Sequence, residues 1–159
     1  MNTKLIKSEI IRLTDQALAL VPLVYVPNLP EIKGMSGVPD WHEYERKIWS
    51  IGEEIQQILV NHKQLKIDTE LLDLFLKVCL NRNAKRGRQS FIMLFEHNYC
   101  AVYADQLITQ MDDEFVYGHV LRALNKMQAD GYALIVLNHQ DDKIAWIRKQ
   151  AKKYLTAFN

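Results

Sequence analysis

Proline is missing from residues 40–159, and the alternating patterns typical of strands are nearly missing from the whole sequence. All four prolines fall within residues 22–39, together with Gly34 and Gly37. Because proline inside a helix removes a hydrogen bond and clashes with the preceding turn, a long proline-free stretch favours helices. We therefore predict an all-α protein with one long loop at residues 22–39. That loop is either a binding arm or an ordered crossover between two helices.

Cysteines, net charge and long apolar runs are also scarce. The two cysteines, Cys79 and Cys100, match neither a C-x-x-C motif nor a disulfide framework, which favours a reducing cytoplasm. The 20 Lys and Arg residues balance the 19 Asp and Glu residues, so no overall charge attracts the protein to nucleic acid or to a membrane. The longest apolar run, residues 17–26, contains Pro22 and is far shorter than the roughly 20 residues of a membrane span.

The sequence contains no recognisable pattern of catalytic residues. Its five histidines never form H-E-x-x-H and never pair with a cysteine at zinc-ligand spacing. Neither a G-x-S-x-G elbow nor a glycine-rich phosphate loop occurs. We therefore expect no metal, no cofactor and no enzyme activity.

Three helices are predicted in the first half of the sequence. Residues 4–20 carry an apolar stripe at helical spacing, formed by Ile6, Ile10, Leu13, Ala17 and Leu20. Asp40 and Glu43 have the spacing of a capping box, and residues 41–62 behind them repeat apolar side chains every three or four positions. Asp68 is expected to cap the next helix, which is apolar nearly all round and is therefore expected to be central.

The second half of the sequence contains an internal repeat. Tyr103-Ala104 recurs as Tyr132-Ala133, and Asp112-Asp113 recurs as Asp141-Asp142, both after 29 positions. Two close carboxylates can supply a general acid and a general base. A catalytic pair is needed once, however, whereas a helix cap is needed in every repeat, so we interpret both pairs as N-caps. A unit of about 30 residues with two helices is typical of a helical-repeat solenoid.

Residues 85–159 resemble the short bacterial HEAT-like repeat proteins. The resemblance rests mainly on residues 142–155, where Ile147-Arg148-x-x-Ala151 follows an aspartate. It implies an α-α superhelix of HEAT-like repeats at 85–159, capped by N-terminal helices at 1–84, within one domain of residues 1–159. In size and composition the chain is also similar to bacterial immunity and adaptor proteins. That similarity implies a non-catalytic protein-binding module, most concretely an immunity protein that neutralises one toxin.

Basic residues gather in the turn after the third predicted helix, at Arg82, Lys85, Arg86 and Arg88. We expect this turn to bind an acidic partner protein. The alternative function is a nucleic-acid-binding helical repeat or a HEAT-like DNA-repair enzyme, in which the same side chains contact phosphates. A second basic cluster, within residues 148–153, is expected to be a solvated helix face.

Three further residues are candidates for partner binding. Trp49 lies off the apolar stripe of its helix, and an exposed tryptophan is typical of an interface. Tyr117 stands where the HEAT-like pattern usually has an arginine, and His119 lies near one acidic pair. The sequence-based site thus consists of these three residues and the basic turn.

Overall fold

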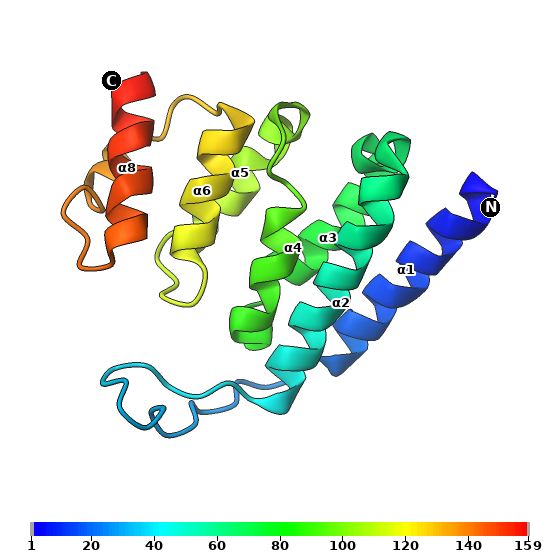
Figure 1. Ribbon diagram of the computed structural model, residues 1–159, viewed down its shortest axis with the longest axis horizontal. Coiled ribbons are helices and arrows are strands. Elements are labelled where there is room, and N and C mark those ends of the chain that lie inside the picture. Colours follow the sequence, from blue (N-terminus) through cyan, green and yellow to red (C-terminus); the bar gives the residue numbers. More distant parts are fainter. Residues whose placement is uncertain (1, 159) are drawn as a thin grey trace. The chain divides into compact units, whose positions relative to one another are not determined.

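The structure, a computed structural model, describes residues 2–158 and is built from helices joined by turns (Figure 1). Apart from one isolated bridge between Glu31 and Pro39, the described residues form no strand pairing, which confirms the all-α prediction. Among these residues no helix is both long enough and apolar enough to cross a bilayer. The elements, with η for 3-10 helices, are α1 (Thr3–Leu20), α2 (Glu43–Asn61), η1 (Lys63–Ile67), α3 (Thr69–Leu80), η2 (Arg82–Arg88), α4 (Gln89–Met93), η3 (Asn98–Tyr103), α5 (Ala104–Leu107), η4 (Ile108–Gln110), α6 (Tyr117–Met127), α7 (Ala133–Leu137) and α8 (Ala145–Phe158).

The chain divides into two compact units, residues 1–91 (unit 1) and 92–159 (unit 2). The boundary therefore falls after Phe91, whereas the sequence placed it after residue 84. That the two units form one domain with an N-terminal cap stays a prediction.

In unit 1, α1 packs against α2 and α3. Its predicted stripe is buried at Ile6, Ile10, Leu13 and Ala17. Asp68 caps α3 as predicted, since its Oδ1 accepts a hydrogen bond from the backbone N–H of Leu71 at 3.2 Å. The predicted start of α2 is wrong by two residues: the N-cap is His42, whose backbone N–H donates to Glu45 Oε2 at 2.8 Å. The capping carboxylate is therefore Glu45, not Glu43.

The basic turn is largely inside unit 1. Lys85, Arg86 and Arg88 expose 1%, 8% and 0% of their surface, while Arg82 is exposed. The expectation that these four residues form an exposed basic surface is therefore wrong for three of them. The physical reason is the buried carboxylate of Glu45, whose Oε1 accepts hydrogen bonds from the Arg86 backbone N–H at 3.1 Å and from Arg86 Nε at 3.4 Å.

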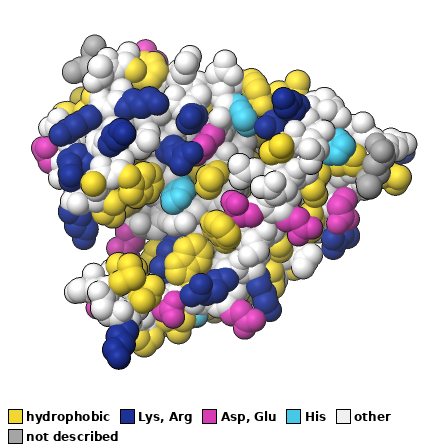
Figure 2. Space-filling model, viewed as in Figure 1, with side chains coloured by type: hydrophobic (Ala, Val, Ile, Leu, Met, Phe, Trp, Pro, Cys, Tyr) yellow, Lys and Arg dark blue, Asp and Glu magenta, His cyan; other side chains and the backbone are white. Residues whose placement is uncertain are grey.

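These buried cations hold the loop of residues 22–39. The Arg86 guanidinium donates to the carbonyl oxygens of Pro39 at 2.8 Å and Asp40 at 2.7 Å. Lys85 Nζ donates to Asn28 Oδ1 at 2.5 Å and lies 4.2 Å from the ring centroid of Tyr25. The loop is thus an ordered crossover. Figure 2 shows hydrophobic side chains over this loop at the lower left. The exposed apolar residues of the loop are Leu23, Val24, Tyr25, Leu29 and Met35.

The turn approaches α2 too closely for any residue but glycine at position 87. A Cβ on Gly87 would lie 2.9 Å from the Cβ of Ile48 and 3.0 Å from the carbonyl oxygen of Glu45. Two residues earlier, Lys85 has φ +48°, a conformation that costs a residue with a side chain about 1–3 kcal/mol. The contacts of Lys85 with the loop offset that cost.

Unit 2 contains two successive helix–turn–helix segments, α5 to α6 and α7 to α8. In each turn an aspartate accepts a hydrogen bond from the residue two positions later: Asp113 from the Phe115 N–H at 3.0 Å, and Asp142 from the Ile144 N–H at 2.8 Å. These turns are 29 residues apart, as in the sequence comparison. The N-cap of α6 is Val116, however, so the interpretation of its acidic pair as a helix cap is wrong.

The two long helices of unit 2 correspond at a separation of 27 residues. Residues that match at this separation are buried in both helices: Val120 with Ile147, Leu124 with Ala151, and Met127 with Tyr154. The apolar pattern of the sequence also predicts that Leu124 corresponds to Leu155, at a separation of 31 residues. That pairing is wrong, because Leu155 is only partly buried whereas Ala151 is buried.

Removing the buried carboxylate should strongly destabilise the protein. We expect Glu45→Ala to lower the free energy of unfolding by about 3–5 kcal/mol, because it leaves the buried Arg86 guanidinium without its anion. The control is Glu9→Ala, which breaks the exposed, solvent-screened ion pair with Arg12 and should leave the free energy of unfolding nearly unchanged. Urea denaturation measures both, and equal small losses would contradict this account of the turn.

The helix correspondence predicts unequal losses for two leucines. Leu124→Ala should cost about 2–5 kcal/mol, because the side chain is fully buried and its removal leaves a cavity. Leu155→Ala should cost less than about 1 kcal/mol, because that side chain keeps contact with solvent. Thermal and urea unfolding test the pair, and equal losses would restore the sequence-based pairing.

Candidate functional site

The sequence-predicted site residues do not form one cluster. Trp49 lines a pocket of unit 1, while Arg82 is exposed at the start of the basic turn. In unit 2, Tyr117 and His119 project from α6 toward different neighbours. The buried members of the basic turn, described above, cannot reach a partner.

The pocket of unit 1 has a volume of about 480 Å³ and is lined by Trp41, Arg46, Trp49, Ser50 and Gln89. The helical pattern of α2 explains its position. Ile48, Ile51 and Ile55 are buried against the rest of unit 1, and Trp49 is turned about 100° away from Ile48 along the helix. Arg46 precedes Trp49 by three residues and so lies on the same side of α2.

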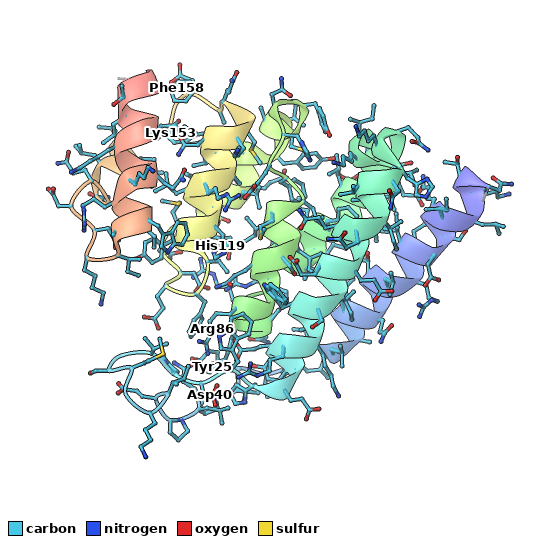
Figure 3. The ribbon with its side chains drawn as sticks, in the orientation of Figure 1. Tyr25, Asp40, Arg86, His119, Lys153 and Phe158 are labelled. Carbon is cyan, nitrogen blue, oxygen red and sulfur yellow. The ribbon has the colours of Figure 1, made fainter. Side chains whose placement is uncertain are left out.

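Contacts with neighbouring groups fix two walls of this tryptophan pocket. The Arg86 guanidinium carbon lies 4.8 Å from the ring centroid of Trp41, a cation–π contact. Arg46 Nη2 donates to Asp40 Oδ1 at 2.9 Å. Figure 3 shows Tyr25, Asp40 and Arg86 together at the base of the loop. The pocket therefore presents aromatic faces and a guanidinium that are already oriented.

The sequence analysis missed the contribution of Trp41 and Arg46 to this pocket. Trp41 was placed on the apolar stripe of its helix, yet it precedes the first residue of α2 and is only partly buried. Arg46 carried no special signal except its helical spacing to Trp49. Two tryptophans and an arginine within nine positions would have been the pattern to notice.

Tyr117 lies in a second pocket, of about 490 Å³, within unit 2. Its hydroxyl donates to Asp142 Oδ2 at 2.9 Å, and its ring stacks on His139 with 4.8 Å between centroids. Burial, and then the hydrogen bond to Asp142, raise the pKa of Tyr117 to about 12. The phenol therefore stays protonated at neutral pH and ties α6 to the turn before α8.

His119 contacts Trp146 edge-on, with 5.5 Å between ring centroids. Burial lowers the pKa of His119 to about 4, and the nearby Arg122 cation adds to this effect. The imidazole is consequently neutral at physiological pH. It contributes an aromatic edge and a hydrogen-bonding nitrogen to this surface, and no charge.

Both cysteine thiols are buried, and burial raises the pKa of Cys79 and raises that of Cys100 to about 11. Each thiol therefore stays protonated at neutral pH. Among residues 2–158, no group of three or more His, Cys, Asp or Glu side chains is arranged to hold a metal ion.

The neutral His119 predicts a specific pH dependence of stability. Its folded pKa of about 4 lies below the unfolded value of 6.5, so the unfolded chain binds the proton first as the pH falls. The contribution of the neutral imidazole to the free energy of unfolding is fully present above pH 6.5 and is lost progressively as the pH falls toward 4. Between pH 7 and pH 5, the free energy of unfolding of His119→Gln should fall by about 2 kcal/mol less than that of the wild type in urea denaturation. Equal losses would mean that the imidazole is solvated.

Comparison of the chain with models of protein families, with curated proteins and with solved structures gave no match.

Proposed function

We propose that this protein is a non-catalytic protein-binding module, and that its partner places an anchor side chain in the tryptophan pocket. The observation that carries the proposal is the pairing of Trp41 and Trp49 with Arg46 around one cavity. Tryptophan and arginine are the residue types that contribute most to binding energy at protein interfaces. An aromatic ring can stack on the indoles, and a carboxylate can pair with the guanidinium.

The rigidity of the pocket supports the same proposal. Trp41 is held by Arg86, and Arg46 is held by Asp40, before any partner arrives. Side chains that are already oriented lose little conformational entropy on binding, which favours affinity. A HEAT-like repeat architecture is part of this proposal, supported by the two equivalent aspartate turns of unit 2. An immunity protein that neutralises one toxin in the cytoplasm is its most concrete version.

Nucleic-acid binding through the basic turn is the less favoured alternative. Its argument depended on phosphate contacts from Arg82, Lys85, Arg86 and Arg88. Three of these side chains are buried. Lys85 already donates a hydrogen bond to the loop, and Arg86 already binds the carboxylate of Glu45. A repair enzyme that uses this turn on phosphates would first have to expose Lys85, Arg86 and Arg88.

The proposal is tested by capture from the native host with the full chain immobilised. A partner protein should be retained by the wild type and by the control Leu5→Ala, which removes an exposed apolar side chain from α1. Trp49→Ala should lose it, and calorimetry with the purified partner should show affinity weakened at least about 30-fold, as expected for a hot-spot tryptophan. Equal retention by both variants would contradict the proposal, as would turnover of a substrate or recovery of nucleic acid alone.

A further inference from the structure

Charge in unit 2 is segregated by helix. Residues 92–159 contain seven Lys and Arg residues and eight Asp and Glu residues. Six of the seven cations lie in α6 or α8, and neither helix contains a single acidic residue. A solvated helix ordinarily mixes both signs to form pairs three or four residues apart. Neither α6 nor α8 contains an acidic residue that could form such a pair with its own cations. The basic residues of these two helices therefore require another explanation.

Residues on one side of each of these helices form two matching rows. One row on α6 contains His119, Arg122 and Lys126, and the other on α8 contains Trp146, Lys149 and Lys153. Within each row the spacing is three and then four residues, which places all three side chains on one helix face. The rows correspond at the same 27-residue separation that relates the buried positions of the two helices. We call these six residues the basic face.

Contacts between the helices bring the two rows side by side. Near the helix starts, a Cβ on Gly118 would lie 2.6 Å from Trp146 Cη2 and 2.8 Å from Ile147 Cδ1, so glycine permits this close approach. Further along, Asn125 Nδ2 donates to the backbone oxygen of Gln150 at 2.9 Å and to its side-chain oxygen at 2.8 Å. The two helices consequently run in the same direction, as Figure 1 shows.

The basic face is open to solvent. Lys149 and Lys153 are exposed, and neither forms an ion pair with any residue in the described part of the chain. Arg122 reaches Glu96 at 3.1 Å but keeps 43% of its side chain exposed. Figure 2 shows the Lys and Arg side chains gathered over α6 and α8, and Figure 3 shows Lys153 between these helices.

Aromatic side chains mark both ends of the basic face. At one end, Trp146 exposes 42% of its surface beside His119. At the other end, Lys126 and Lys153 line a pocket of about 520 Å³ together with Phe158. The face thus offers apolar contacts at its ends and positive charge between them.

We propose that the basic face is a docking surface for a short acidic segment of another protein. The rows are about 10 Å long and about 8–10 Å apart, which suits one helix or one extended segment laid between them. Carboxylates limit the surface at both ends, because the exposed Asp130 follows α6 and the exposed Asp141 precedes α8. A DNA backbone commonly needs six or more phosphate contacts and would continue past these carboxylates, so the small footprint favours a peptide.

The inference involves only unit 2, and it holds or fails independently of the tryptophan pocket. Its test measures binding of the full chain to short poly-L-glutamate and to a DNA duplex of equal charge. The wild type should bind the peptide more tightly than the duplex. Lys153→Glu should weaken peptide binding at least about tenfold, because it reverses a charge within the face. The indole N–H resonance of Trp146 should shift on titration of the wild type.

Lys4→Glu is the matched control. Lys4 is exposed, lies on α1 in unit 1 and changes the net charge equally, but it is not part of the basic face. Its substitution should change peptide affinity by less than about twofold. Equal weakening by both variants would show attraction by net charge alone and would overturn the inference. Tighter duplex binding with a steep salt dependence would overturn it in favour of nucleic acid. Self-association of the wild type that Lys153→Glu abolishes would assign the face to a second copy of the chain.

Discussion

The carboxylate of Glu45 is the constraint on which unit 1 depends. One of its oxygens accepts the backbone N–H of His42 and so defines the start of α2. The other accepts two N–H groups of Arg86 and so fixes the turn that follows α3. Because a buried charge without its partner is strongly destabilising, the helix start and the turn cannot form separately. One anion thus couples segments that are about forty residues apart in the sequence.

The same interaction extends to the tryptophan pocket. Arg86 binds the carbonyl oxygens at the end of the loop and covers one face of Trp41. One of those carbonyls belongs to Asp40, whose carboxylate orients Arg46. The pocket is therefore built outward from the buried ion pair, and a change at Arg86 would disorder the pocket itself. Only a substitution of a pocket residue such as Trp49 tests the proposed recognition without disturbing that ion pair.

Local sequence signals predicted the parts of the fold that local physics decides. The stripe of α1 and the cap at Asp68 follow from spacing within one helix, and both are present. The burial of Lys85, Arg86 and Arg88 was not predictable in this way, because the anion that neutralises Arg86 is on α2, far away in the sequence. The register of α8 was also missed, because the aspartate turns repeat after 29 residues whereas the buried positions of the helices repeat after 27. In the site, Trp49 was identified because it departs from its stripe, whereas Arg46 fits an ordinary solvated helix.

The two basic clusters of the sequence are the turn at Arg82–Arg88 and residues 148–153. The first was expected to be a binding surface and the second a solvated helix face, and the structure differs from the first of these expectations. The denser cluster is interior, because Glu45 and the oxygens of the loop lie within reach of its cations. The cluster on α8 was expected to be a plain solvated face, but α6 and α8 supply no acidic side chain to neutralise it. What separates the two cases is the supply of anions, not the density of cations. Where a chain provides its own carboxylate, a basic cluster stabilises the fold. Where the neighbouring helix provides further cations, as on α6 and α8, exposed lysines such as Lys149 and Lys153 stay open to solvent, and this is the charge that the proposed acidic segment would match.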